Sequence, residues 1–212
     1  MTRRPRVVVL DYGSGNLRSA QRALQRGGAD AEVTADAAAA LTADGLVVPG
    51  VGAFAACMAG LVGVGGDQVI AKRLAAAAPV LGICVGMQVL FDAGDEHGQR
   101  TDGCGCWPGV VQKLAAPILP HMGWNVLVPA TGSRLLAGLG ADEMFYFVHS
   151  YAVTSPPHRP GAAAQPLSSM AVHGQEFVAV VEDGPLAATQ FHPEKSSDAG
   201  AALLANWLGE LR

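Results

Sequence analysis

Short, continuous apolar runs that alternate with helical stretches constrain this fold more than any other feature of the sequence. The runs "RVVVLD", "DGLVVPG" and "PVLGI" show no polar alternation, as expected for strands buried on both faces of a parallel sheet. Between the first two runs, "NLRSAQRALQRGG" has the apolar spacing of an amphipathic helix, and "DAEV" is typical of a further short strand. The alternation predicts an α/β fold with a doubly wound, mostly parallel sheet.

The second half of the chain has a different texture. Its segments are longer and more alternating, and the turn pairs His173-Gly174 and Asp183-Gly184 predict added β-hairpins. The final stretch, "SDAGAALLANWLGELR", predicts a closing helix whose N-cap is Ser197 or Asp198. Because no repeat or linker interrupts the pattern, we expect residues 1–212 to form a single domain.

Composition and charge exclude several classes of function. Half of the residues are hydrophobic, only 15% are charged, and the net charge is −4 without a basic cluster, so we expect no nucleic-acid binding. The uncharged stretch Leu74–Phe91 approaches the length of a membrane span, but Pro79, Gly82 and Gly86 divide it. A helix end, a strand and a second helix fit this stretch better, so we expect no membrane. The four cysteines show no secreted pattern, which favours reduced thiols in the cytoplasm.

The motif "LGICVGMQ" raises the question of catalysis. Cys84 stands between the strand "PVLGI" and a predicted helix "VGMQVLFD", with Gly82 and Gly86 two residues to either side. This spacing is typical of a nucleophile elbow, whose sharp turn leaves no room for neighbouring side chains. The turn would place the Val85 N–H where an oxyanion forms, and the helix dipole would favour a thiolate. The motif alone leaves a second interpretation open, a cysteine packed in the core.

A cysteine nucleophile needs a base, and "ATQFHPEKS" offers His192 with Glu194 two residues later. In an extended segment such residues point to the same side, and Pro193 would keep the segment extended, so the carboxylate could orient the imidazole. Taken alone, a His-x-Glu pair is more often a chance arrangement on the surface than a catalytic pair. The other histidines are expected in exposed loops, at a turn or in the core: His97, His158, His173, His121 and His149.

The turn "VVPGVGAF" follows a predicted buried strand. Its glycines let backbone N–H groups approach a ligand, so Val51 and Gly52 could supply a second oxyanion donor. Alone, it could be an ordinary turn at the end of a strand.

Together, PGVG, G-x-C-x-G-x-Q and H-P-E resemble the class I (triad) glutamine amidotransferases over nearly the whole chain. Within this class, "DYGSGNLRS", "GICVGMQVLF", "LPHMGWN", "FYFVHSY" and "QFHPEKS" are similar to the glutaminase subunits of imidazole glycerol phosphate synthase. The resemblance implies that Cys84, His192 and Glu194 hydrolyse glutamine through a glutamyl thioester. It implies an oxyanion site at Val51, Gly52 and Val85, and glutamine contacts from four further residues: Gln88, Glu96, Ser150 and Tyr151.

The fold is expected to use the whole chain, which leaves no domain to consume the ammonia and calls for a docked acceptor enzyme. The resemblance implies a heterodimer with a (β/α)₈-barrel cyclase in histidine biosynthesis, and we expect "DYGSGNLRS" and "PHMGWN" near that interface. No cofactor or metal is expected: Cys104 and Cys106 lack a second ligand pair and are predicted to be buried thiols, and Arg18 replaces the third glycine of a dinucleotide motif at "GSGN".

Two alternatives stay open. The chain could be the glutaminase subunit of another ammonia-using synthase, for anthranilate, aminodeoxychorismate or pyridoxal phosphate. It could also be a non-catalytic binding protein on the same scaffold.

Overall fold

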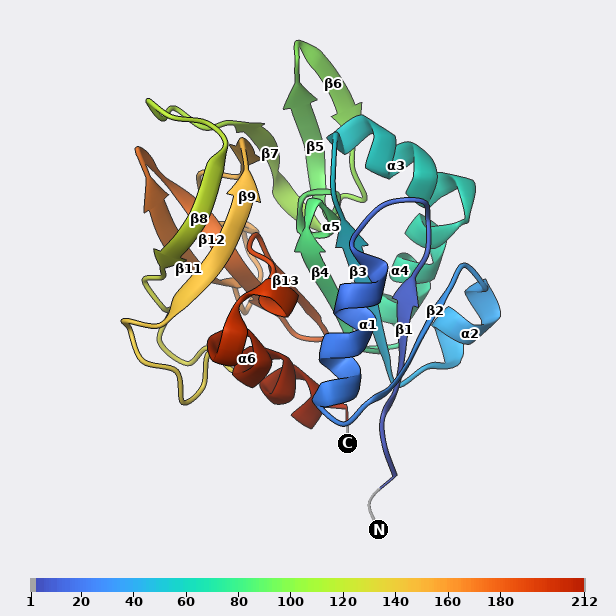
Figure 1. Ribbon diagram of the computed structural model, residues 1–212. Helices are drawn as coiled ribbons and strands as arrows, with labels where there is room; N and C mark the ends of the chain where they lie inside the picture. Colours follow the sequence, from blue (N-terminus) through green and yellow to red (C-terminus); the bar gives the residue numbers. More distant parts are fainter. Residues whose placement is uncertain (1–2, 212) are drawn as a thin grey trace.

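A seven-stranded sheet runs through the middle of the computed structural model, which describes residues 3–211 (Figure 1). Its strand order is β11-β12-β13-β4-β3-β1-β2. Five of the strands pair in parallel: β1 (Arg6–Leu10), β2 (Asp30–Thr34), β3 (Gly45–Gly50), β4 (Val80–Cys84) and β13 (Leu186–Thr189). The four strands predicted in the first half are confirmed. Residues 1, 2 and 212 of the predicted domain lie outside the described part.

Helices cover both faces of this sheet. In Figure 1, α1 (Leu17–Arg26) and α6 (Ser197–Gly209) lie side by side in front of the sheet, and α3 (Phe54–Gly63) and α4 (Gly66–Ala75) lie behind it. The short α2 (Ala37–Thr42) packs against α4. The doubly wound arrangement predicted from the sequence is therefore present, because strands buried on both faces need helices on both sides.

The start of the closing helix differs from the prediction. Its N-cap position is Ser196 rather than Ser197 or Asp198. The Ser196 hydroxyl does not cap the helix; it donates to the His192 carbonyl at 2.6 Å and accepts the Tyr146 N–H at 2.9 Å. The serine thus ties the segment around His192 to a neighbouring strand.

The predicted helix over "VGMQVLFD" is wrong in its second half. The helix α5 (Val85–Gln88) has only four residues, and β5 (Phe91–Glu96) begins shortly after it. The Leu90 carbonyl accepts the N–H groups of Cys106 and Trp107, so pairing with a distant strand overrides the local helical pattern. A four-stranded sheet results, of order β10-β7-β5-β6, with β6 (Gln99–Asp102), β7 (Trp107–Lys113) and β10 (Tyr151–Ala152).

The remaining strands form the predicted hairpins. β11 (Leu167–His173), β12 (Gln175–Asp183) and β13 are antiparallel neighbours, and their turns contain Gly174 and Gly184 at positive φ. A separate ribbon joins β8 (His121–Val126) to β9 (Met144–His149). Within residues 3–211 no single helix is long and apolar enough to cross a membrane, although α3 and α4 pass that test when taken together, with a bend of 77° between them.

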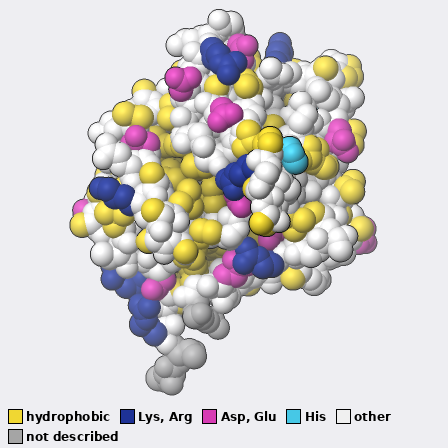
Figure 2. All heavy atoms as spheres, turned by 180° about the vertical axis from the view of Figure 1, so that it is seen from behind, with side chains coloured by type: hydrophobic (Ala, Val, Ile, Leu, Met, Phe, Trp, Pro, Cys, Tyr) yellow, Lys and Arg dark blue, Asp and Glu magenta, His cyan; other side chains and the backbone are white. Residues whose placement is uncertain are grey.

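Charged side chains are mixed on the rear face of the molecule. In Figure 2, Lys and Arg lie scattered among acidic side chains and gather only where the chain starts. Three arginines line a hollow there, Arg3, Arg4 and Arg6, and Arg3 pairs with Asp44 at 2.7 Å.

Candidate active site

Cys84 sits on a strained turn between β4 and α5. Its φ is +56°, a region that side-chain-bearing residues rarely adopt, and the residue is buried. A Cβ atom on Gly86 would lie 1.8 Å from the Val48 carbonyl oxygen, and one on Gly82 would lie 2.7 Å from the Gly86 oxygen. The elbow predicted from the glycine spacing therefore exists, and it needs both glycines.

His192 and Glu194 meet, but not for the reason predicted. Pro193 does not extend the segment; it opens the 3₁₀ turn η1 (Pro193–Lys195), and only His192 itself is extended. The turn brings the carboxylate back to the ring, where Glu194 Oε1 lies 2.8 Å from His192 Nδ1. Both side chains are almost fully buried. The pairing is therefore a property of the tight turn.

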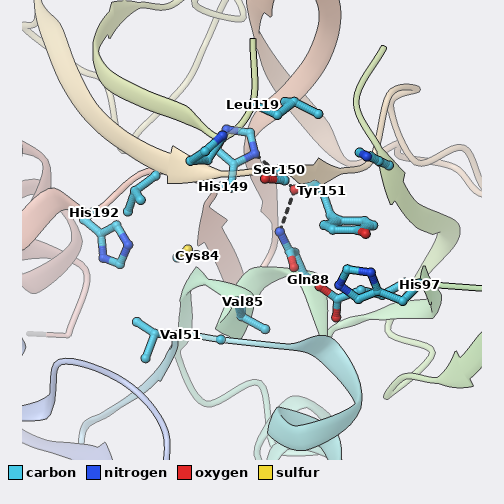
Figure 3. Close-up of a pocket in the computed structure, with 15 residues that line it drawn as sticks. Val51, Cys84, Val85, Gln88, His97, Leu119, His149, Ser150, Tyr151 and His192 are labelled. Carbon is cyan, nitrogen blue, oxygen red and sulfur yellow. Dashed lines mark hydrogen bonds between the residues drawn. The ribbon is translucent and has the colours of Figure 1, made fainter. Parts of the chain in front are cut away.

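The other ring nitrogen faces the cysteine. His192 Nε2 is buried and has no hydrogen-bond partner within residues 3–211, and Figure 3 shows the imidazole beside Cys84. Burial disfavours the charged imidazole, but the Cys84 sulfur and the Glu194 carboxylate outweigh burial and raise the pKa of His192 to about 9. The raised pKa favours the cationic form of His192 at neutral pH, beside the Cys84 sulfur.

A cavity of about 560 Å³ opens above Cys84. The sequence-predicted site residues, all except Glu194, line it: Val51, Gly52, Cys84, Val85, Gln88, Glu96, Ser150, Tyr151 and His192. Six further lining residues were not predicted: His97, Lys113, Leu119, Pro120, Val148 and His149. Lys113 lies on β7, Val148 and His149 lie on β9, and the other three lie in turns and loops. Four of the six stand in the segments "LPHMGWN" and "FYFVHSY", whose spacing did not point to a cavity.

The turn at Val51 is held by hydrogen bonds from residues that were not expected in the site, and two of them belong to the segment "DYGSGNLRS". Ser14 Oγ accepts the Val51 N–H at 3.0 Å and donates to the Val51 carbonyl at 2.7 Å. The Cys57 sulfur lies 3.1 Å from the same hydroxyl, and the Tyr12 hydroxyl donates to the Pro49 carbonyl. The Val51 N–H is therefore engaged by Ser14 in this conformation.

Gln88 belongs to a buried polar network. Its Nε2 donates to the Tyr151 carbonyl at 2.8 Å, a contact drawn in Figure 3, and to Gln190 Oε1 at 3.0 Å. Gln190 Nε2 in turn lies 3.8 Å from the Cys84 sulfur. Sequence reasoning missed Gln190, although it stands two residues before His192. Glu96 makes a different contact, accepting the Phe54 N–H at 2.7 Å at the start of α3.

Cys104 and Cys106 lie outside this cavity. They are half-buried rather than buried as predicted, because they sit on the segment between β6 and β7. Burial raises the pKa of Cys104 to about 12 and that of Cys106 to about 11. The described part of the chain has no cluster of three His, Cys, Asp or Glu side chains arranged for a metal ion.

Comparison with known proteins identifies the family. The model of the family "Glutamine amidotransferase class-I" matches residues 8–211. This chain belongs to the class-I glutamine amidotransferases. As a member of the family, the amidotransferase releases ammonia from the amide of glutamine.

Three relatives of this amidotransferase carry the name imidazole glycerol phosphate synthase subunit HisH. The relative from Mycobacterium bovis is 64% identical over 205 residues, covering 97% of this chain and 98% of that protein. The relative from Nocardia farcinica is 62% identical with full coverage of both chains, and the one from Thermobifida fusca is 60% identical.

Solved structures support the fold. A crystal structure of a glutamine amidotransferase superimposes with a TM-score of 0.71 at 21% identity, covering 96% of this chain and 97% of that one. PurLQS from Thermotoga maritima gives 0.72 at 17% identity, covering 99% of this chain and all of that one.

Proposed function

We propose that this amidotransferase is the glutaminase subunit of an imidazole glycerol phosphate synthase in histidine biosynthesis. Three relatives with 60–64% identity bear that name over nearly their whole length, which supports the assignment. The single observation that carries the chemistry is the elbow cysteine, Cys84, facing an imidazole whose Nδ1 is held by Glu194 at 2.8 Å.

In the proposed first step, the Cys84 thiolate attacks the carboxamide carbon of glutamine. A C–S bond forms, and the carbonyl electron pair moves onto oxygen. The His192 cation then gives its Nε2 proton to the amide nitrogen, the C–N bond breaks, and ammonia leaves a glutamyl thioester. Neutral His192 next takes a proton from water, whose oxygen attacks the thioester carbon. The C–S bond then breaks, glutamate leaves, and the Cys84 thiolate and the His192 cation are restored. Glu194 keeps the ring oriented and stabilises its cation throughout.

The oxyanion formed in both steps needs donors. We assign this role to the Val85 N–H, the first amide of α5, and to the turn at Val51 and Gly52. Because Ser14 engages the Val51 N–H, this donor must rotate away from Ser14 before it can serve. Gly52 has a φ of +91° and open space around it, which permits such a rotation.

The glutamine itself is proposed to lie between Cys84 and the far wall of the cavity. The Glu96 carboxylate would bind the α-ammonium group, and Gln88 would bind the side chain. The carbonyls of Ser150 and Tyr151 already accept from Leu114 and Gln88, so their N–H groups are the part of this backbone left for the α-carboxylate.

The pH profile tests the role of His192. The ordinary pKa of histidine is 6.5, and the value here is about 9, so the stabilisation that its partners give the cation is full below pH 6.5 and lost as the pH rises through about 9. We therefore expect kcat/KM for glutamine to fall as the pH passes about 9. Rates measured from pH 7 to 10 check this, and a flat profile would contradict the assignment.

Ammonia released in water is mostly protonated near neutral pH and is lost as a nucleophile, so the proposal includes a docked cyclase of the (β/α)₈-barrel type in a heterodimer. An exposed apolar strip supports such a surface: along β8, Met122 and Trp124 are 65% and 49% exposed. We place this strip and the loop that precedes α1 at the interface. The cytoplasm stays the proposed compartment, since the four cysteines are free thiols.

Charge reversal tests that placement. Arg18 is exposed on the first turn of α1. Within residues 3–211 its side chain makes one hydrogen bond, to Gln21 at 2.9 Å. At an interface rim, Arg18→Glu should weaken binding to the cyclase by about tenfold. Titration calorimetry measures this, with Arg26→Glu at the other end of the helix as the control. Equal affinities for both variants and the wild type would remove the start of α1 from the interface.

Glutamate release by the purified chain, alone and with the cyclase and its ribonucleotide substrate, tests the function as a whole. We expect slow release alone and a large rise in the complex. A full rate of glutamate release that does not change when the cyclase is added would contradict the pathway assignment. It would then favour another ammonia-using synthase, and pull-down of the partner would identify it. No release under either condition would favour a non-catalytic binding protein.

A further inference from the structure

Two buried histidines lie beside the cavity but have no part in the proposed chemistry. His121 on β8 and His149 on β9 stand directly opposite each other in the ribbon, and the two residues are 4% and 7% exposed. His149 also lines the cavity. Buried imidazoles are polar and need hydrogen-bond partners, so their contacts show what they do there.

These contacts form a chain of hydrogen bonds in which each donor points the same way, toward Tyr151. His149 Nδ1 lies 3.0 Å from the Tyr151 carbonyl, which can only accept, so this nitrogen carries the hydrogen. In a neutral ring the other nitrogen then accepts, and His121 Nδ1, 3.0 Å from His149 Nε2, must be the donor. His121 Nε2 is left to accept from Asn125 Nδ2 at 3.2 Å, and the second amide hydrogen of Asn125 goes to the Val172 carbonyl at 2.9 Å.

Both imidazole rings are held neutral, as the directions of these hydrogen bonds require. Burial, followed by the neighbouring His173, lowers the pKa of His121 to about 4. Burial, followed by the neighbouring His121, lowers the pKa of His149 to about 3. Neither ring is therefore protonated at both nitrogens near neutral pH.

This chain of hydrogen bonds ends at the Cys84 sulfur. The Tyr151 carbonyl also accepts from Gln88 Nε2, as Figure 3 shows, and Gln88 gives its other amide hydrogen to Gln190 Oε1. Gln190 Nε2 is thereby turned toward the Cys84 sulfur, 3.8 Å away. The Tyr151 carbonyl can only accept, so the amide nitrogen of Gln88 must face it. The side-chain oxygen of Gln88 is therefore the atom left to contact a ligand.

We propose that His121 and His149 are positioning residues, which fix the Tyr151 carbonyl and through it the amide orientations of Gln88 and Gln190 beside Cys84. The inference rests on the proposed function, because it takes the cavity to be the glutamine site. The competing explanation is aromatic packing alone. His121 also stacks on Phe147 and His173, at ring distances of 4.7 and 4.2 Å, and a phenylalanine could do that equally well.

Nuclear magnetic resonance of the wild type tests the chain without any activity measurement. In protein labelled with ¹⁵N-histidine, long-range proton–nitrogen correlations at pH 7.5 report which ring nitrogen carries hydrogen. We expect both His121 and His149 to be neutral and protonated at Nδ1. Protonation at Nε2 in either ring would break the direction of the chain and overturn the inference.

Steady-state kinetics with glutamine tests the positioning role. His149→Phe keeps a ring but removes the donor to Tyr151, so we expect KM for glutamine to rise about tenfold, with a smaller change in kcat. His149→Asn can present an amide N–H to the same carbonyl and should recover most of this loss. His173→Phe is the matched control, because His173 stacks on the His121 ring but lies against the Ile118 carbonyl, outside the hydrogen bonds to Tyr151.

The outcomes separate this inference from the proposed function. If the wild type hydrolyses glutamine and the KM of His149→Phe for glutamine equals that of the wild type, the inference fails while the proposed function stands. If the wild type releases no glutamate with any partner, the function fails and the tautomer measurement still decides the chain. Should His149→Phe not fold, the comparison of His149→Asn with the wild type carries the kinetic test: a KM within threefold supports the amide donor, and a tenfold rise contradicts it.

Discussion

Cys84→Ala is expected to lower glutamate release by about 10⁴-fold or more, because it removes the sulfur that we propose forms the thioester. Alanine keeps the Cβ atom and therefore the strained backbone at φ +56°, so the elbow should survive the change. The variant should bind glutamine, and its complex with the cyclase should still form. Single-turnover glutamate assays measure the loss, and the cyclase affinity shows that the fold is intact.

A second cysteine provides the control for this experiment. Cys104→Ala removes a half-buried thiol whose pKa is raised to about 12 and which does not line the cavity, so its rate should match the wild type. Intact-mass analysis after treatment with an electrophilic glutamine analogue should show one adduct in the wild type and in Cys104→Ala, and none in Cys84→Ala. An adduct in Cys84→Ala, or retention of more than a few per cent of the rate, would place the nucleophile elsewhere.

Gly86→Ala is expected to reduce the free energy of unfolding by about 3 kcal/mol or more, and to remove activity with it. The added Cβ would lie 1.8 Å from the Val48 oxygen, which belongs to the backbone of β3 and cannot turn away as a side chain could. Relief requires α5 to move off the sheet, and that movement also displaces the Val85 N–H from Cys84. Urea unfolding measures the change in stability from the shift in midpoint, provided that the dependence of the unfolding free energy on urea concentration is the same in both proteins.

Gly63→Ala is the matched control for Gly86→Ala. Gly63 ends α3, and a Cβ atom there meets nothing within 4 Å. Alanine at that helical position should leave stability unchanged or raise it by a few tenths of a kcal/mol, since alanine is the better helix former. If Gly86→Ala unfolds at the same urea concentration as this control, the contact between α5 and β3 is looser than described.

The two errors of sequence reasoning near the site have one physical origin. Phe91 belongs to a pattern that favours a helix locally, yet it pairs with Trp107 in a parallel strand. His192 and Glu194 were expected to meet across an extended segment and instead meet across a 3₁₀ turn. In both places a long-range contact, to the Leu90 carbonyl or from Ser196 to Tyr146, sets the backbone that local propensity left undecided.

The parallel sheet, its helices and the elbow could be predicted from residue spacing along the chain. Burial of continuous apolar runs and the lack of space around Cys84 act over a few neighbouring residues, so spacing alone carries them. The groups that surround the Cys84 sulfur could not be predicted in this way, because they come from distant parts of the chain. Gln190 is 106 positions from Cys84, and Ser14 is 37 from Val51. Such partners meet because the order of strands brings their ends to one edge of the sheet, and that order is set by packing of the whole chain.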